Sequence, residues 1–306
     1  MTILQLGGPC LLVHGGAKEL KPSEKSDGTI ERSCDGIASA LTAGRAILES
    51  GGPAVDAVVA AVRILEDHAD FNAGTGSSLN AEGLVQMDSG IMEGSGRRVG
   101  AVTNVHRLRH PVEAARIVLN ESEHVLLCGT EADDFALARG GEHASQFDLV
   151  TDHARSELAE ELTGQSAGGH DTVGAVALDA EGRLAAATST GGLAGQAPGR
   201  VADSCCPGAG LWADESTAVA ATGEGEYFLR TSFAHRVAAE TSRTDLGAAC
   251  AEALADVDRL GGTGGCIALQ ADGTAVIHFN TEIMYTGWSD HRGHQHMGLW
   301  PEDFEV

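Results

Sequence analysis

The chain has 306 residues, of which 42% are hydrophobic, so it can bury a substantial core and form one large domain or two small ones. Its 44 acidic residues outnumber 20 basic ones, for a formal net charge of −24, and a nucleic acid or anionic membrane surface would therefore be repelled. No apolar run approaches the ~20 residues that span a bilayer, and residues 1–9 lack the charged start and apolar centre of a signal peptide, so we expect a cytoplasmic protein.

Strands and helices are predicted to alternate along the first half of the chain. We set the boundaries of these elements from three signals: the hydrophobic periodicity, a proline at the first turn of one helix, and Gly51-Gly52 at the end of another. We expect a strand over Cys10–Val13, helices over Cys34–Leu48, Pro53–Leu65 and Pro111–Leu119, strand-like runs within Leu84–Val105, and a buried strand over Val125–Leu127. From about Arg139 to His170 the composition becomes polar and glycine-rich, which predicts a linker.

The second half predicts two hairpins of similar layout. One joins Val173–Leu178 to Arg183–Thr190, and the other joins Cys266–Leu269 to Thr274–Phe279. Between them we expect a strand over Ala218–Ala221 and helices over Tyr227–Ala239 and Asp245–Leu260. Strands such as Val173–Leu178 are apolar on both faces and must be covered on both. Because helices can supply only one cover, the pattern predicts an α+β fold of two stacked sheets flanked by helices.

The strongest functional signal is Thr172, which stands between a glycine-rich approach and the first hairpin. Cleavage of the Asp171–Thr172 peptide bond would give one residue both a hydroxyl nucleophile and a free α-amino group to act as its base. A threonine hydroxyl alone is a poor nucleophile at pH 7, but an N-terminal amine with a pKa near ~8 can accept its proton. The hairpin would bring Thr190 beside Thr172. An Asp-Thr pair before a strand is more often a simple strand start, so this hypothesis depends on companion motifs.

Two further segments suit the recognition of an amino acid. Arg200 can bind a carboxylate through a planar, two-pronged hydrogen bond, and Asp203 can accept a hydrogen bond from an ammonium group. Together they suit the zwitterionic head of an amino acid. The glycines of Thr222–Glu226 let backbone N–H groups approach a ligand closely, as an oxyanion hole requires.

Six segments follow one another in a specific order and spacing: Val13–Ala17, Phe71–Gly76, Asp171-Thr172, Ala187–Gly192, Thr222–Glu226 and Phe279–Glu282. Together they resemble the plant-type L-asparaginases and isoaspartyl peptidases, a family of N-terminal nucleophile hydrolases, over nearly the whole chain. The resemblance implies a four-layer αββα sandwich in a single domain over residues 1–306. It also implies self-cleavage into residues 1–171 and 172–306, with the linker at about 139–171.

The resemblance further implies an autoprocessed amidohydrolase that acts on L-asparagine and on β-aspartyl (isoaspartyl) peptides through an aspartyl-enzyme intermediate. It implies that the chemistry needs no cofactor and that the enzyme is a homodimer of cleaved protomers. The implied roles are Thr172 as nucleophile, Thr190 as its supporting hydroxyl, Thr222 and Gly223 as the oxyanion hole, Arg200 and Asp203 as the holders of the α-carboxylate and α-amino groups, Gly225 as pocket lining, and Asn72 close to the nucleophile. A structural sodium ion is implied as well, held by backbone carbonyls of Leu65, Glu66, His68, Phe71, Ala73 and Thr75.

The sequence departs from the family pattern at a few positions. Ala202 stands where the family usually has glycine, Cys205 and Cys206 follow Ser204 where a proline is usual, and Ile283 stands where glycine is common. These changes bear on the choice of substrate more than on the chemistry. The seven cysteines are odd in number and scattered, which favours reduced thiols over disulfides. The adjacent pair could be a redox or metal feature, but a loop insertion without a role is the favoured interpretation.

Two rival functions remain open at this point. A glycosylasparaginase would share the nucleophile, but the His14–Ala17 start and the missing secretory signal argue against it. A non-catalytic protein whose glycine loops bind a small molecule through its phosphate would show no chain cleavage at all.

Charge and histidines leave smaller questions. The only lysines are Lys18, Lys21 and Lys25, and the acidic surplus fits either a surface adapted to high salt or an ordinary acidic protein. We expect His14 to bond to backbone in a structural role rather than to bind a ligand. The remaining candidates are His291, His294 and His296, whose spacing is loosely compatible with a metal but is better explained by a solvated tail.

Overall fold

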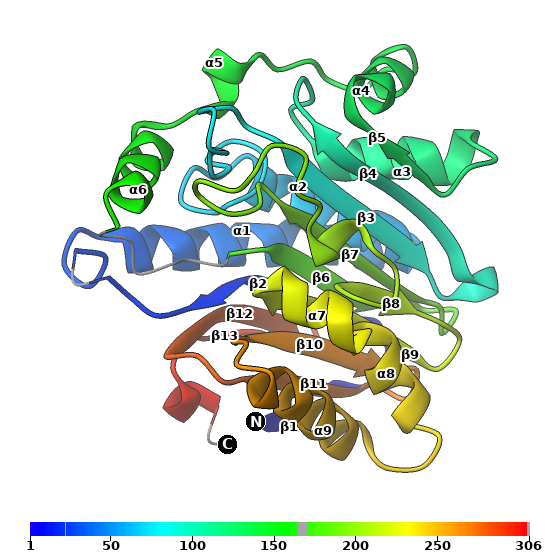
Figure 1. Ribbon diagram of the computed structural model, residues 1–306. Helices are drawn as coiled ribbons and strands as arrows, with labels where there is room; N and C mark the ends of the chain where they lie inside the picture. The colour runs from blue at the N-terminus through cyan, green and yellow to red at the C-terminus, as the bar shows by residue number, and fades with distance from the viewer. Residues whose placement is uncertain (22, 165–170, 305–306) are drawn as a thin grey trace.

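Two β-sheets lie face to face between layers of helices in the computed structural model, which describes residues 1–21, 23–164 and 171–304 (Figure 1). This arrangement confirms the predicted α+β class with two sheets flanked by helices. In the described ranges, no helix has both the length and the apolar character needed to cross a membrane.

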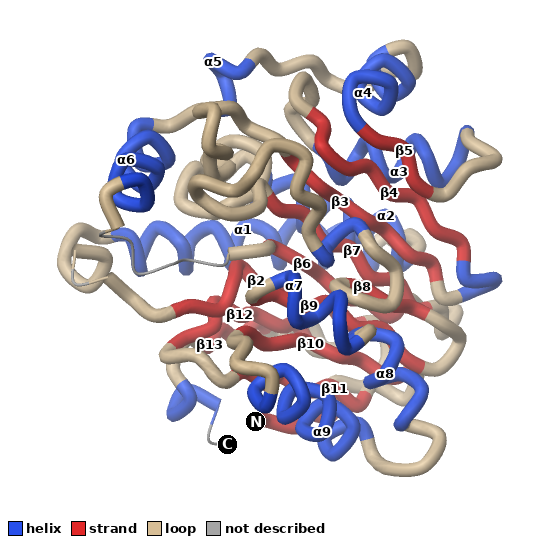
Figure 2. Tube along the Cα trace, viewed as in Figure 1, coloured by secondary structure: helices blue, strands red, loops and turns tan. Residues whose placement is uncertain are grey.

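The larger sheet has eight strands and is antiparallel except for the parallel pair β4 and β5. In spatial order its strands are β13 (Gln295–Gly298), β12 (Ile283–Ser289), β2 (Cys10–Lys18), β6 (Val173–Leu178), β7 (Leu184–Thr190), β3 (Met87–Glu93), β4 (Arg98–Val105) and β5 (Leu126–Cys128). The smaller sheet has five strands, in the order β1 (Thr2–Gln5), β11 (Thr274–Phe279), β10 (Gly264–Gln270), β9 (Thr217–Gly223) and β8 (Leu211–Ala213). Figure 2 shows the strands of both sheets at the centre of the molecule.

Helices cover the outer face of each sheet. Those against the larger sheet are α1 (Thr29–Glu49), α2 (Ala54–Glu66), α3 (Pro111–Glu121) and α4 (Gly129–Leu137). Those on the side of the smaller sheet are α7 (Gly225–Thr231), α8 (Phe233–Glu240) and α9 (Leu246–Arg259). Two short helices, α5 (Gln146–Leu149) and α6 (Asp152–Leu162), lie within the predicted linker at about 139–171, of which residues 165–170 fall outside the described residues.

The alternation of side chains along β6 explains why this strand is apolar on both faces. Val173, Ala175 and Ala177 belong to the core formed with α1 and α2. Val176 and Leu178 face the other way and belong to the core between the two sheets. Burying both faces of β6 favours one fixed register, because a slip of one residue would exchange the two sets of side chains.

Many of the local predictions are confirmed, but the segment predicted as a linker contains two helices, and a predicted helix and a predicted buried strand also differ. The first strand of the first hairpin has its predicted bounds, the second begins at Leu184 rather than Arg183, and Val173 pairs with Ser189. The expected helix over Tyr227–Ala239 is broken at Ser232, which has a left-handed φ of 50° and separates α7 from α8. The prediction of a buried strand over Val125–Leu127 is wrong in its burial, because β5 is an edge strand and Leu126 is 40% exposed.

Candidate active site

The first hairpin brings Thr172 and Thr190 to the same end of the larger sheet. Val173 pairs with Ser189. Thr172, which precedes Val173, and Thr190, which follows Ser189, therefore lie together at the open end of the hairpin. Both threonines are nearly fully buried and line one narrow cavity. The Thr190 hydroxyl oxygen accepts a hydrogen bond from the backbone N–H of Gly192 at 3.1 Å, which leaves its own proton available for donation.

This cavity collects most of the residues predicted for the site. Its lining consists of Asp171, Thr172, Thr190, Gly192, Leu193, Arg200, Ala202, Asp203 and Gly223. They come from the start of β6, the end of β7 and the segment after it, and the end of β9, so both sheets contribute. Thr222, the other expected oxyanion residue, precedes Gly223 in β9 and is fully buried.

Arg200 and Asp203 form the charged end of the cavity. The Arg200 Nε and Nη2 atoms donate to the two carboxylate oxygens of Glu226, each at 2.9 Å. The Asp203 side chain is buried, and its Oδ2 atom has no hydrogen-bond partner among the described residues. Burial raises the pKa of Asp203 to about 7, although Arg200 acts to lower it. A buried carboxylate oxygen without a partner is suited to accept a hydrogen bond from a ligand.

Two glycines near this end of the cavity stand where a side chain would meet its neighbours. A Cβ at Gly225 would lie 2.7 Å from Asp203 Oδ1 and 3.1 Å from Arg200 Nη2. Gly223 has a φ of 146°, and a Cβ there would collide with the backbone carbonyl of Thr263. A side chain at position 225 would therefore enter the space beside the charged pair.

Asp88, in β3, supports the charged end and was not predicted from the sequence. Its Oδ2 accepts a hydrogen bond from the Ala202 N–H at 2.6 Å, and its Oδ1 accepts one from the Thr103 hydroxyl at 2.6 Å and one from the Asn104 N–H at 2.8 Å. Burial raises the pKa of Asp88, and these three donors act to lower it. The bond to Ala202 fixes the segment that leads into Asp203. Asp88 and Ala202 are 114 residues apart, so no local pattern could have revealed the contact.

His14 is fully buried in β2 beside the start of β6. Burial lowers the pKa of His14 to about 3, so the ring is neutral at pH 7. The ring packs against Gly174, where any Cβ would collide with its Nε2 atom. This packing fits the expected structural role, but the expected hydrogen bond to backbone is not formed, because neither ring nitrogen has a hydrogen-bond partner among the described residues.

Asn72 acts on the loop that follows Thr190. Its side-chain amide donates to the Gly192 carbonyl at 2.7 Å, and its Oδ1 accepts from the Ser78 N–H at 2.8 Å. The Asn72 carbonyl accepts a hydrogen bond from the Gly191 N–H at 2.9 Å. These bonds hold the main chain at the edge of the cavity in one position.

The segment expected to hold sodium folds back on itself between α2 and Ser77. Four of the six expected carbonyl groups, those of Leu65, Glu66, His68 and Phe71, accept backbone hydrogen bonds within the segment. A carbonyl oxygen keeps a second lone pair when it accepts one hydrogen bond, so these groups can still ligate a hard cation. The Glu66 side chain accepts from the Ser189 hydroxyl at 2.6 Å and the Val112 N–H at 2.9 Å, and burial raises its pKa to about 8.

The remaining cysteine and histidine candidates lie outside the cavity lining. The Cys205 and Cys206 sulfur atoms are 3.9 Å apart, and both point to the Ala202 carbonyl. Each C-terminal histidine has its own partner: His291 contacts the Leu6 carbonyl, His294 contacts Asp290, and His296 stacks on Trp288. In the part of the chain that the structure describes, no group of three or more His, Cys, Asp or Glu side chains is placed to hold a metal ion.

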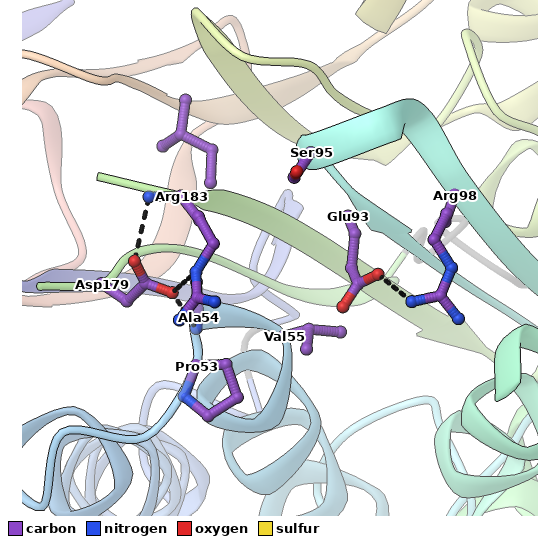
Figure 3. A pocket seen from close by; sticks show the side chains of 9 residues that line it. Pro53, Ala54, Val55, Glu93, Ser95, Arg98, Asp179 and Arg183 are labelled. Atoms are coloured by element: carbon purple, nitrogen blue, oxygen red, sulfur yellow. Dashed lines mark hydrogen bonds and ion pairs between the residues drawn. The ribbon is translucent and has the colours of Figure 1, made fainter. Parts of the chain in front are cut away.

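A second hollow lies at the turn end of the first hairpin, and Figure 3 shows its charged lining. Asp179 accepts hydrogen bonds there from the N–H of Ala54 at 3.0 Å and from Arg183 Nε at 2.8 Å. Arg98 pairs with Glu93 at 2.7 Å. These charged groups pair with one another, and Asp179 links the hairpin turn to the start of α2. We therefore assign this hollow a structural role.

The sequence matches the family of asparaginases over residues 7–299. The chain therefore belongs to the asparaginase family, as the motifs predicted.

Three relatives resemble it over nearly their whole length. The isoaspartyl peptidase of Escherichia coli (strain K12) is 38% identical over 305 residues, which cover 92% of this chain and 93% of the relative. The isoaspartyl peptidase/L-asparaginase of Macaca fascicularis is 38% identical, and the alignment covers 97% of this chain and 98% of the relative. That of Danio rerio is 36% identical and covers 96% of each chain.

Proposed function

We propose that this chain cuts itself before Thr172 and then hydrolyses the side-chain amide of L-asparagine and the β-linked peptide bond of isoaspartyl dipeptides. The observation that carries the proposal is the single cavity in which Thr172 meets the charged pair Arg200 and Asp203. The names of the relatives support the two substrates. The stacked sheets with outer helices support an N-terminal nucleophile hydrolase fold of the αββα type.

Self-cleavage comes first because Thr172 has no free amine in the intact chain. The Thr172 hydroxyl oxygen adds to the Asp171 carbonyl carbon, the peptide C–N bond breaks, and the hydroxyl proton ends on the Thr172 nitrogen. Water then hydrolyses the resulting ester. The products are a carboxylate on Asp171 and a threonine with both a hydroxyl and an amine, which is the nucleophile and base in one residue.

Substrate hydrolysis uses the same hydroxyl in two steps. The Thr172 amine takes the hydroxyl proton as the oxygen attacks the substrate's side-chain carbonyl, and the proton then passes to the leaving ammonia or amino acid. Thr222 and Gly223 would stabilise the negative charge on the carbonyl oxygen. Thr190 can donate a hydrogen bond toward the Thr172 oxygen, because its own oxygen is already held by Gly192. Water attacks the aspartyl-enzyme ester and releases aspartate.

The charged end of the cavity would select the aspartyl head group. Arg200 would bind the α-carboxylate, and Asp203 would accept a hydrogen bond from the α-ammonium through its free oxygen. Glu226 holds the Arg200 fork in the absence of substrate, so the α-carboxylate must share or replace that contact. Asn72 would keep the loop after Thr190 in place.

Two further parts of the proposal lie outside the bond-breaking steps. Sodium would be held by the backbone carbonyls of Leu65, Glu66, His68, Phe71, Ala73 and Thr75, where its positive charge would stabilise the segment that carries Asn72. We also propose a homodimer of cleaved protomers.

A panel of four substrates tests the proposed activity. Purified protein should release aspartate from L-asparagine and from β-aspartyl-leucine, and it should be inactive on α-aspartyl-leucine, whose free carboxylate is on the wrong carbon to reach Arg200. N-acetylglucosaminyl-asparagine should be a poor substrate, and good turnover of it would favour a glycosylasparaginase. The absence of both activity and cleavage would favour a binding protein.

A further inference from the structure

The lysines of this chain are concentrated at one place in the fold. There are three in 306 residues, at positions 18, 21 and 25, and each one forms an ion pair. Lys21 pairs with Glu160 of α6 at 2.9 Å, and Lys25 pairs with Glu282 at 2.6 Å. Lys18 differs from both because one of its two partners is Asp171, the residue before the proposed cleavage point.

The ion pair between Lys18 and Asp171 is buried. The Lys18 Nζ atom lies 2.8 Å from Asp171 Oδ2 and 2.8 Å from Glu24 Oε1, and the three side chains are 10%, 14% and 8% exposed respectively. Glu24 is itself fixed, because its other oxygen accepts the Lys21 backbone N–H at 2.8 Å. A buried, charge-assisted hydrogen bond of this length is strong and directional.

The strand that carries Lys18 also packs closely against residue 171. A Cβ at Gly16 would lie 2.5 Å from Asp171 Oδ1 and 2.8 Å from its Cα, so β2 lies directly against this residue. β2 and β6 pair with His14 opposite Gly174, which carries the end of β2 alongside the Asp171–Thr172 peptide bond. Lys18 is the last residue of β2 and therefore reaches the carboxylate from a rigid support.

We propose that Lys18 is a positioning residue for self-cleavage, which fixes the acyl side of the Asp171–Thr172 peptide bond through its ion pair with the Asp171 carboxylate. The inference rests on the proposed function, since it concerns the same bond. Attack on a carbonyl needs the reacting atoms aligned about 3–3.5 Å apart, and small displacements slow such a step by on the order of 10- to 100-fold. A residue that packs closely against β2 and whose carboxylate is held by a buried ion pair meets this need.

The pair also makes cleavage depend on the charge of Asp171. Burial raises the pKa of Asp171, Lys18 acts to lower it, and Glu24 and Glu157 act to raise it. Tyr285, whose ring centroid is 5.8 Å from Lys18 Nζ, also faces the pair. For Lys18, burial acts to lower the pKa, but Asp171 and Glu24 together raise it above its ordinary value. Without Lys18, the Asp171 carboxylate would become protonated at a higher pH.

Cleavage of the full chain after a short pulse of cell-free synthesis tests the proposal. Intact mass spectrometry would follow the loss of whole chain over time from pH 5 to 9 in the wild type, Lys18→Met, Lys18→Arg and Lys25→Met. The last variant is the matched control, because it removes an ion-paired lysine from the same segment without touching Asp171.

Lys18→Met should cleave on the order of 10-fold more slowly or worse at pH 7.5. Lys18→Arg should restore part of the rate, and Lys25→Met should stay within about twofold of the wild type, since its exposed pair contributes little. The acid side of the rate profile should move to higher pH in Lys18→Met and stay in place in Lys25→Met.

A double-mutant cycle separates positioning from a general loss of stability. If the pair acts as a unit, Lys18→Met combined with Asp171→Asn should cleave no more slowly than Asp171→Asn alone. Three outcomes would each overturn the proposal. The effects of Lys18→Met and Asp171→Asn on the cleavage rate could be additive, Lys18→Met could keep the wild-type rate and pH profile, or Lys18→Met could be slow with an unmoved pH profile. A wild-type chain that stays whole would overturn the proposed function itself. That result differs from a failure of the Lys18 proposal, in which the wild-type chain is still cleaved.

Discussion

Replacing Gly225 with alanine should weaken substrate binding while leaving self-cleavage intact. The new methyl carbon would lie 2.7 Å from Asp203 Oδ1, about 0.7 Å short of the 3.4 Å at which ordinary contact begins. The buried carboxylate must turn or retreat by a similar amount. A hydrogen bond of roughly 2.8 Å from the substrate ammonium would then lengthen to about 3.5 Å, where it is lost.

The size of the effect follows from that bond. A hydrogen bond to a charged group contributes about 1.5–3 kcal/mol, which corresponds to a fall in kcat/KM of about 10- to 150-fold. The fall should be similar for L-asparagine and β-aspartyl-leucine, because the two share the head group. Self-cleavage should persist, since the scissile bond of the chain does not present an ammonium group to Asp203.

The assay is kcat/KM on both substrates with fully cleaved enzyme, checked by intact mass. Gly8→Ala is the matched control, because its methyl would meet only the His291 side chain, at 3.8 Å. Wild-type kcat/KM in a fully cleaved Gly225→Ala enzyme would refute the placement of the head group beside Asp203.

Three further outcomes are expected. Arg200→Ala should cut kcat/KM for both β-linked substrates by similar factors of about 30- to 5,000-fold, since removing one partner of a desolvated charge pair costs roughly 2–5 kcal/mol. Unequal or negligible losses in steady-state kinetics would contradict the role of Arg200 in binding the α-carboxylate. Because burial raises the pKa of Asp203 to about 7 and only the ionised form can hold an ammonium, kcat/KM should fall as the pH drops below about 7. A profile that is flat down to pH 5 would exclude that dependence. With a net charge of −24, the thermal midpoint should rise between low and molar salt as repulsion is screened, and a flat or falling midpoint in a salt series would leave an acidic protein without such adaptation.

The elements that the sequence predicted well are those whose signals are local. The first hairpin has an Asp-to-Gly turn between two apolar strands, and both strands were placed to within one residue. The break at Ser232 could not be predicted, because a serine gives no local sign of a left-handed backbone. The edge strands β1 and β13 were missed because short strands with exposed residues lack a clear hydrophobic period.

The candidate site divides in the same way. Thr172, Arg200 and Asp203 could be proposed because they stand in recognisable motifs, and the structure gathers them in one cavity. Asp88 and Lys18 could not, because their contacts with Ala202 and Asp171 join residues 114 and 153 positions apart. Such contacts depend on the pairing of strands and leave no pattern in a single sequence.

The free amine of Thr172 is the central claim, and its most direct test is intact mass analysis combined with N-terminal sequencing of active protein. We predict two associated fragments, residues 1–171 and 172–306, with threonine as the new N-terminus, while Thr172→Ala remains one inactive chain. Active wild-type protein that is a single chain, or one cut elsewhere, would contradict the account.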